Sequence, residues 1–198
     1  MPYSDLKQQL NVMLNGALSS AFSYRDKDTH AHSVRVVQLC HDFASFLSLG
    51  DQDKRILSIA ALFHDVGKIG IPDSIISKEG KLSKEEWKTI TKHPKIGKDI
   101  VKRLKTKDAD IIASVVEHHH EYYNGKGYPN GLKGKKIPLA SRVISLLDSY
   151  DALTSDRDYR IGMSHEKAIS IMKSEVGVKF DPTLAASFFQ HIEHIIAT

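Results

Sequence analysis

Histidine and aspartate side chains recur along this sequence at intervals close to one helix plus its connecting turn. Imidazole and carboxylate groups without thiolates suit iron, manganese or other ions that favour octahedral coordination. Five histidines and two aspartates exceed what one tetrahedral zinc ion requires, so we expect a centre with more than one metal ion. The candidate ligands are His32, His64, Asp65, His93, His119, His120 and Asp148.

Helical spacing predicts that these side chains face the interior. Apolar residues at 115 and 116 mark the buried face of one helix, and the residues four positions later are His119 and His120. The same step places Asp148 and Asp151 on the core face of a later helix, where an ionised carboxylate is costly unless it is paired or bound to metal. His118 falls off this face and is expected outside the ligand set.

A single histidine on an apolar face is usually a hydrogen-bonded core residue. Five at regular spacing, two of them beside an aspartate or a second histidine, favour a metal site instead. Neighbouring helical residues point about 100° apart. We therefore expect His119 and His120 to serve different ions, with Asp65 bridging the two.

The elements that must position these residues are predicted to be helices. Apolar residues recur with helical periodicity almost throughout, and no segment shows sustained two-residue alternation, so the fold class is all-α. A Gly-rich loop is expected over residues 123–136, and a capping box over Ser83–Glu86 opens one helix. We expect helices at about 5–22, 29–49 (stopped by Gly50), 53–66, 83–90, 94–104, 108–121, 138–153, 164–172 and from 181 onward.

Composition excludes several classes of protein. Hydrophobic residues make up 41% and charged residues 26% of the 198 residues, which is ordinary for a globular domain and unlike a disordered or fibrous chain. A net charge of +4 is too mild for DNA coating, and no apolar run is long enough to span a membrane. The N-terminus lacks a secretory signal, and the one cysteine, Cys40, fits a reducing compartment, so the expected location is the cytoplasm.

Four motifs in order resemble the HD superfamily of metal-dependent phosphohydrolases and, more narrowly, the HD-GYP domain. His64–Lys68 matches HDxGK, and residues 119–129 match HHExxDGxGYP with Asn124 in place of the usual Asp. Residues 148–160 match DxxDALTSDRPYR, and residues 180–182 match the closing FDP. The resemblance runs from about residue 25 to 182. It implies a helical bundle over residues 25–198 with a multi-metal centre in its core, and the helix expected from periodicity precedes this domain in residues 1–24.

The resemblance further implies hydrolysis of the cyclic dinucleotide c-di-GMP to linear pGpG, and in some members on to GMP. Two or three ions, commonly iron or manganese, are implied on the seven candidate ligands. Asp28 stands where three-metal members carry Glu, although it could instead cap the helix that follows. Asp65 and Lys68 are the expected catalytic residues. Lys68, Arg157 and Arg160 fall on substrate-contacting positions.

Several alternatives remain open at this level. Lys68 could be a cation at a helix C-terminus, and Arg157 and Arg160 could pair with neighbouring aspartates. Tyr128 could stack on a base or pack its own turn. The substrate could be another cyclic dinucleotide such as cGAMP, or a mononucleotide. The third interpretation is a catalytically silent signalling module that binds nucleotide or partner proteins. Separately, the GYP loop is expected to offer a binding site for a regulatory protein.

Overall fold

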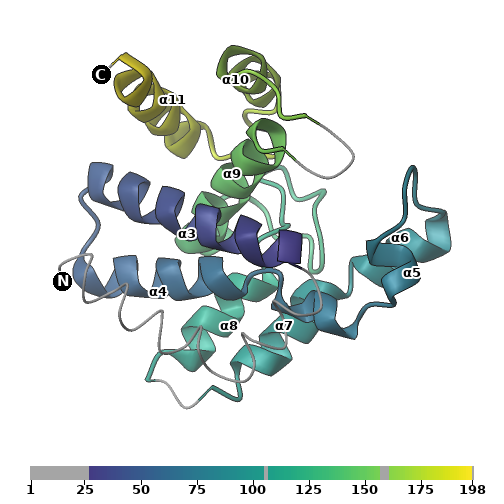
Figure 1. Ribbon diagram of the computed structural model, residues 1–198. Helices are drawn as coiled ribbons and strands as arrows, with labels where there is room; N and C mark the ends of the chain where they lie inside the picture. The colour runs from purple at the N-terminus through teal and green to yellow at the C-terminus, as the bar shows by residue number, and fades with distance from the viewer. Residues whose placement is uncertain (1–26, 105–106, 157–160, 198) are drawn as a thin grey trace.

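The computed structural model describes residues 27–104, 107–156 and 161–197 (Figure 1). The helix predicted for residues 1–24 lies outside them. The described helices are α3 (Lys27–Phe46), α4 (Asp51–Phe63), α5 (Asp73–Ile76), α6 (Lys84–Ile90), α7 (His93–Val101), α8 (Ala109–Glu117), α9 (Leu139–Thr154), α10 (His165–Ser174) and α11 (Pro182–Ala197), with 3₁₀ turns η1 (Val66–Gly70) and η2 (Gly134–Lys136).

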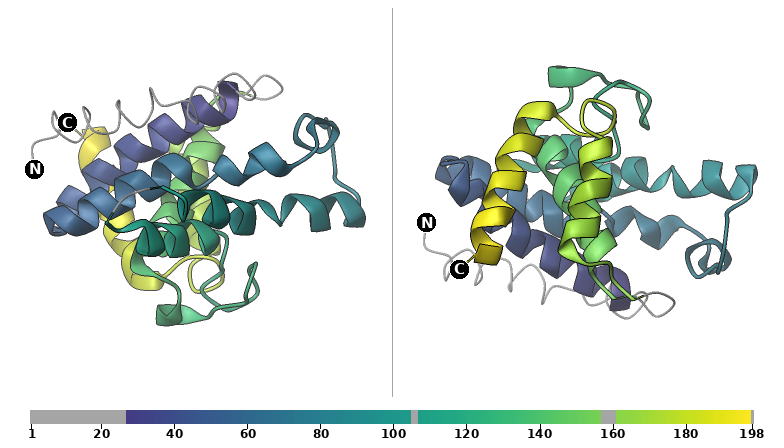
Figure 2. Two further views of the ribbon diagram at one scale, coloured as in Figure 1. Left: turned by 90° about the horizontal axis from the view of Figure 1, so that it is seen from below. Right: turned by 90° about the horizontal axis from the view of Figure 1, so that it is seen from above.

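The all-α prediction is confirmed. In the described ranges the only strand-like pairing is one isolated bridge between Val176 and Phe180. Helix α3 packs on α4 and α9, α4 also packs on α8, and α7 packs on α8 and η1. Their buried faces meet in a core that includes Phe43, Leu57, Ile112, Ile144 and Phe188. Figure 2 shows α10 and α11 on one side of this bundle and α5 and α6 projecting from it.

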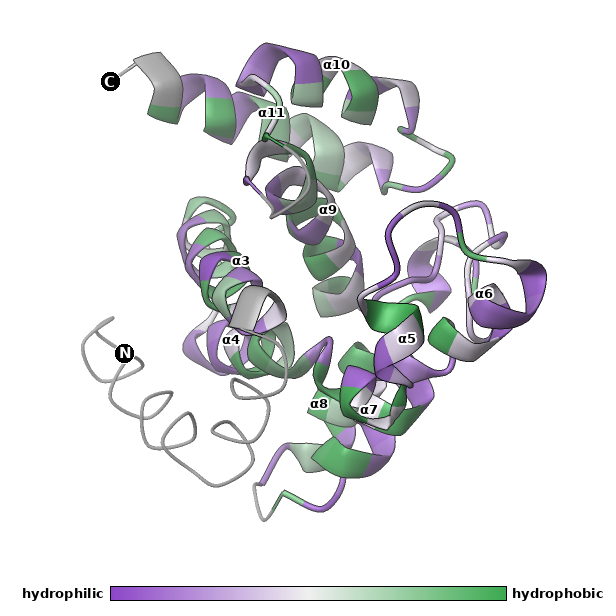
Figure 3. Ribbon diagram, turned by 45° about the vertical axis from the view of Figure 1, so that its right-hand side comes forward, coloured by the Kyte–Doolittle hydropathy of each residue, from purple (hydrophilic) through white to green (hydrophobic). Residues whose placement is uncertain are grey.

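Apolar residues form stripes on the helices and do not fill any of them (Figure 3). No helix among the described residues is long and apolar enough to cross a membrane.

Several helix starts are confirmed. Ser83 and Glu86 form the reciprocal capping box in front of α6. Ser164 caps α10 by accepting from the Lys167 N–H, and Asp181 accepts from the N–H groups of Thr183 and Leu184.

Four predicted helix ends are too late, and one of them is that of the helix expected to reach residue 104, which ends at Val101. The helix expected to reach residue 49 ends at Phe46, where Ser48 turns the chain with a φ of 53°, and Gly50 instead precedes α4. The helices expected to reach residues 66 and 121 end at Phe63 and Glu117. In both, a histidine just beyond the helix donates to a carbonyl of the last turn. His64 and His119 thus lie just beyond helix ends.

Candidate metal centre

Ligating atoms of the seven candidate residues gather in two neighbouring clusters. Within each cluster these atoms lie within 4.8 Å of one another. The helices deliver them from α3, α7 and α9 and from the turns that follow α4 and α8. Cluster A consists of Asp65, His93, His119 and His120, and cluster B consists of His32, His64 and Asp148.

Backbone carbonyls fix the orientation of three of these histidines. Each directs Nδ1 at the carbonyl oxygen three residues earlier, so Nδ1 carries the proton and Nε2 presents a lone pair to the cluster. Such an outer hydrogen bond typically sets the tautomer of a metal-binding histidine. The pairs are His64 with Ala61 at 2.7 Å, His93 with Ile90 at 2.8 Å, and His119 with Val116 at 2.6 Å.

The lone pairs converge in a way that a cation would satisfy. Nε2 of His93 lies 3.3 Å from Nε2 of His119, and neither nitrogen has a proton to donate when Nδ1 is the donor. Nε2 of His64 is buried and has no hydrogen-bond partner among the described residues. Buried polar atoms normally have partners. The residues present therefore fit divalent ions.

Asp65 lies between the two clusters. Its Oδ1 is 3.3 Å from Nε2 of His93 in cluster A, and its Oδ2 is 3.4 Å from Nε2 of His64 in cluster B. Lys68 donates to the same Oδ2 at 2.7 Å. One carboxylate thus faces both groups of lone pairs, which is the geometry that a bridging ligand requires.

His32 is held by two carboxylates. Its Nε2 lies 3.0 Å from Oδ1 of Asp148, and its Nδ1 lies 2.6 Å from Oδ2 of Asp151. Arg35 fixes Asp151 through two hydrogen bonds of 2.8 and 3.0 Å. Asp151 had a signal in the sequence, its place on the core face beside Asp148, but was not included among the site residues. Arg35 contacts Asp151 from 116 residues earlier in the chain, a distance over which sequence spacing gives no signal.

The pKa of His32 in cluster B shifts in the opposite direction to the pKa values of the histidines in cluster A. Burial is the main cause that lowers the pKa of His93 to about 4 and that of His120 to about 3. Burial also opposes the charged form of His32, but the hydrogen bonds to Asp148 and Asp151 outweigh it and raise its pKa to about 9. The pKa of Asp65 is well below its usual range because Lys68 and the neighbouring histidines together outweigh its burial.

Close backbone packing brings the fragments of cluster A together. A Cβ on Gly67 would lie 1.9 Å from the carbonyl oxygen of His93 and 2.5 Å from the nitrogen of Gly97. Only glycine therefore lets η1, which follows the His64–Asp65 pair, lie against the start of α7. Gly67 thus serves packing against His93.

The loop after cluster A is fixed to it in a similar way. A Cβ on Gly127 would lie 2.5 Å from the carbonyl oxygen of His120, to which Tyr128 donates its N–H at 3.2 Å. The Tyr128 ring is half-buried and tilts against the His120 ring with centroids 4.9 Å apart. Asn124 accepts from the Lys126 N–H at 2.9 Å, a contact that an aspartate in its place would also make.

One expectation about the ligands was wrong. His119 and His120 lie in the same cluster, with ring centroids 4.0 Å apart, and do not serve different clusters. The reason is that α8 ends at Glu117, so the helical angle assumed for the pair does not apply. His118 lies outside both clusters as predicted, but it is buried and bonded to Asn130 and to the Ser114 carbonyl.

Three predicted site residues cannot be placed. Arg157 and Arg160 lie outside the described residues, and so does the side chain of Asp28, whose backbone belongs to α3.

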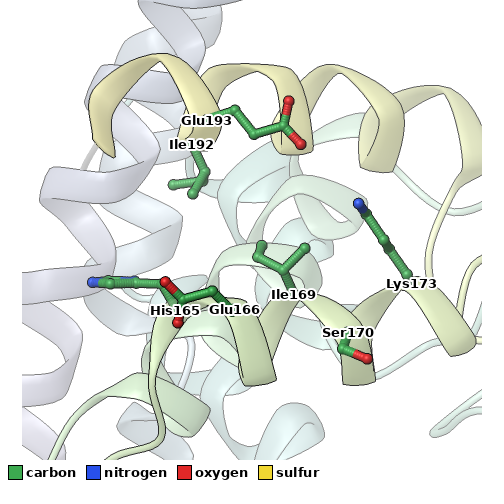
Figure 4. A pocket seen from close by; sticks show the side chains of 7 residues that line it. All are labelled: His165, Glu166, Ile169, Ser170, Lys173, Ile192 and Glu193. Atoms are coloured by element: carbon green, nitrogen blue, oxygen red, sulfur yellow. The ribbon is translucent and has the colours of Figure 1, made fainter. Parts of the chain in front are cut away.

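A separate pocket of about 590 Å³ lies between α10 and α11 (Figure 4). Ile169 and Ile192 line it together with the polar residues His165, Glu166, Ser170, Lys173 and Glu193. None of its lining residues belongs to cluster A or cluster B.

Comparison with known proteins identifies the family. The sequence model described as HD domain matches residues 17–184. The chain belongs to the HD-domain family. The predicted resemblance to the HD superfamily and to HD-GYP domains is confirmed by this match and by relatives of the same type.

Curated relatives of this HD domain include enzymes with two different substrates in their names. The cyclic di-GMP phosphodiesterase response regulator RpfG of Xanthomonas campestris is 37% identical over 83% of this chain and 44% of its own length. The 3′3′-cGAMP-specific phosphodiesterase 2 of Vibrio cholerae is 34% identical over 91% of this chain and 34% of its own length. The chain spans less than half the length of these relatives.

Solved structures share the HD fold. An HDG"Y"P protein from Bdellovibrio bacteriovorus aligns with a TM-score of 0.68 and 24% identity, covering 98% of this chain and 61% of that one. A cyclic GMP-AMP specific phosphodiesterase of V. cholerae aligns with a TM-score of 0.66 and 22% identity, covering 82% and 44%.

Proposed function

We propose that this HD domain is a metal-dependent phosphodiesterase of cyclic dinucleotides, with c-di-GMP as its substrate and pGpG as its first product. The observation that carries the proposal is the Asp65 carboxylate, whose two oxygens face the lone pairs of two adjacent clusters. Two ions a few ångströms apart, when bound, would activate water and neutralise the charge of a phosphodiester.

The metal ligands follow from the clusters. Cluster A would hold one ion and cluster B the other, with Asp65 shared between them. Imidazole and carboxylate ligation favours iron or manganese. A third ion would require Asp28, whose side chain lies outside the described residues, so the third ion stays a prediction.

Partial exposure marks the side from which substrate arrives. Asp148 keeps 19% of its side chain exposed and Lys68 24%, whereas His64 and His93 are buried. The Lys68 ammonium group both holds the Asp65 carboxylate in place and lies where the charge of a bound phosphate would need compensation. Its 2.7 Å contact with Asp65 supports a role in the site over that of a cation at a helix end.

Other contacts to substrate stay predictions. Arg157 and Arg160 are proposed to bind the phosphates or guanine edges of the dinucleotide, for which guanidinium groups are suited. Tyr128 lies beside His120, with ring centroids 4.9 Å apart. A regulatory protein that docks on the GYP loop is likewise a prediction.

A cGAMP-selective enzyme is the second candidate because relatives named for cGAMP and for c-di-GMP have similar identity to this chain. A catalytically silent module is disfavoured because all seven ligand positions keep residues that bind metals.

Turnover of three substrates by metal-reconstituted protein tests the proposal. Protein loaded anaerobically with iron or manganese is incubated with c-di-GMP, with cGAMP and with a simple chromogenic phosphodiester. We expect c-di-GMP to be cleaved with the highest kcat/KM and His93→Ala to be inactive. Preferential cleavage of cGAMP would identify cGAMP, in place of c-di-GMP, as the substrate. No cleavage of any diester would overturn the proposed activity.

A further inference from the structure

The one tryptophan of the chain, Trp87, lies on α6 with its side chain 53% exposed. A large aromatic ring on the surface is common by itself. This one lies in a series of rings that leads to cluster A. Its centroid is 6.1 Å from that of Tyr128 at an interplanar angle of 78°, and Tyr128 in turn contacts His120.

The segment that carries Trp87 is fixed in position. The capping box closes the start of α6, with Ser83 N–H to Glu86 at 2.6 Å and Glu86 N–H to Ser83 at 3.2 Å. Lys78 bonds the same Glu86 at 2.7 Å across the α5–α6 connection. A helix held this way fixes the Trp87 backbone, so little backbone freedom is lost when a flat ligand group lies against the ring.

The end of α6 is anchored directly to cluster A. The carbonyl of Ile90, its last residue, accepts the hydrogen bond from Nδ1 of His93 at 2.8 Å. Trp87 is one helical turn earlier on the same element. Although α5 and α6 project from the bundle (Figures 1 and 2), this end of α6 is joined to the ligand set.

We propose that Trp87 is a substrate-positioning residue that stacks on a purine base of the cyclic dinucleotide; this inference rests on the proposed function. A phosphodiester bound at the metal clusters joins two nucleosides. At least one of them must extend away from the buried ligands, toward residues at the edge of the site. The T-shaped contact with Tyr128 leaves 53% of the Trp87 side chain exposed, and this surface is available to a base. Base–aromatic stacking tolerates any base, so Trp87 would bind c-di-GMP and cGAMP alike.

Kinetics of two substitutions at this position test the proposal. We expect Trp87→Ala to raise KM for c-di-GMP about tenfold with kcat nearly unchanged, and Trp87→Phe, which keeps an aromatic face, to stay within about threefold of the native KM. Phe46→Ala is the matched control, because Phe46 is a 39% exposed aromatic residue on α3, about 20 Å along the helix from His32. Metal content should be native in all three.

Tryptophan fluorescence gives a second readout, since Trp87 is the sole source of it. A phosphorothioate analogue of c-di-GMP should quench the emission of the metal-loaded protein, whereas inorganic phosphate, which lacks a base, should not. An unchanged KM in Trp87→Ala, or equal quenching by inorganic phosphate, would overturn the role of Trp87. If native protein cleaves c-di-GMP, such a result leaves the proposed function intact; if native protein cleaves no cyclic dinucleotide, the proposed function itself fails and the inference fails with it.

Discussion

Clusters A and B are neighbours built from the same kinds of side chain, yet they differ in what holds their histidines. In cluster A, backbone carbonyls orient His93 and His119, and burial keeps the imidazoles neutral. In cluster B a carbonyl likewise orients His64, but two carboxylates hold His32, and its pKa is raised to about 9. Cluster A therefore presents lone pairs at neutral pH, whereas cluster B must release a proton from His32 before that imidazole can bind a metal.

The difference shows two ways of orienting a histidine before a metal ion binds. A carbonyl fixes the tautomer and adds no net charge, while the Asp151 carboxylate also increases the basicity of the imidazole and needs Arg35 to fix it. The predictions below depend on this contrast, in order of decreasing effect.

Asp65→Asn should abolish measurable turnover, because it removes the one carboxylate that faces both clusters. We expect kcat/KM to fall by at least about a hundredfold and both ions to bind more weakly. Asp99→Asn, an exposed change on α7, is the control and should keep native activity and metal content. Full metal occupancy in Asp65→Asn, by elemental analysis, would contradict the bridging role.

Asp151→Asn should affect cluster B far more than cluster A. Loss of the carboxylate that orients His32 should weaken metal binding in cluster B by about ten- to a hundredfold. Competition with a chelator should then remove one ion early and leave the other at native affinity. Equal weakening of both ions would show that Asp151 is not specific to cluster B.

The metal-free protein should lose stability on both sides of neutral pH, for different reasons. The lowered pKa values of His93 and His120 mean that their contribution is full above pH 6.5 and is lost as the pH falls toward 4. The raised pKa of His32 means that its contribution is full below pH 6.5 and is lost as the pH rises through about 9. Thermal unfolding measured across this pH range checks both losses of stability. His32→Phe should remove only the loss at alkaline pH.

His118→Ala should leave turnover and metal content close to native, because His118 lies outside both clusters. It should nevertheless cost roughly 1–3 kcal/mol of stability, since it breaks part-buried hydrogen bonds to Asn130 and Ser114. Urea unfolding measures the cost. A loss of metal equal to that of His119→Ala would mean that His118 is a ligand.

The sequence predicted the fold class and all seven members of the two clusters, because apolar periodicity and the His-Asp spacing are local signals. It placed the ends of α4 and α8 too late, since residues 64–66 and 118–121 contain no Gly or Pro to signal a stop, and the helices end where His64 and His119 bond a carbonyl of the last turn. The wrong expectation that His119 and His120 serve different ions followed from the late helix end predicted for α8. Arg35 and Trp87 could not be predicted, because their roles depend on contacts with Asp151 and Tyr128, which are distant in the sequence.

The most direct test of the two-cluster centre is anomalous diffraction from crystals of the full chain loaded anaerobically with manganese or iron. The account predicts one anomalous peak among Asp65, His93, His119 and His120 and a second among His32, His64 and Asp148, with the Asp65 carboxylate between them. A single peak in a fully loaded crystal, or peaks away from these residues, would contradict it.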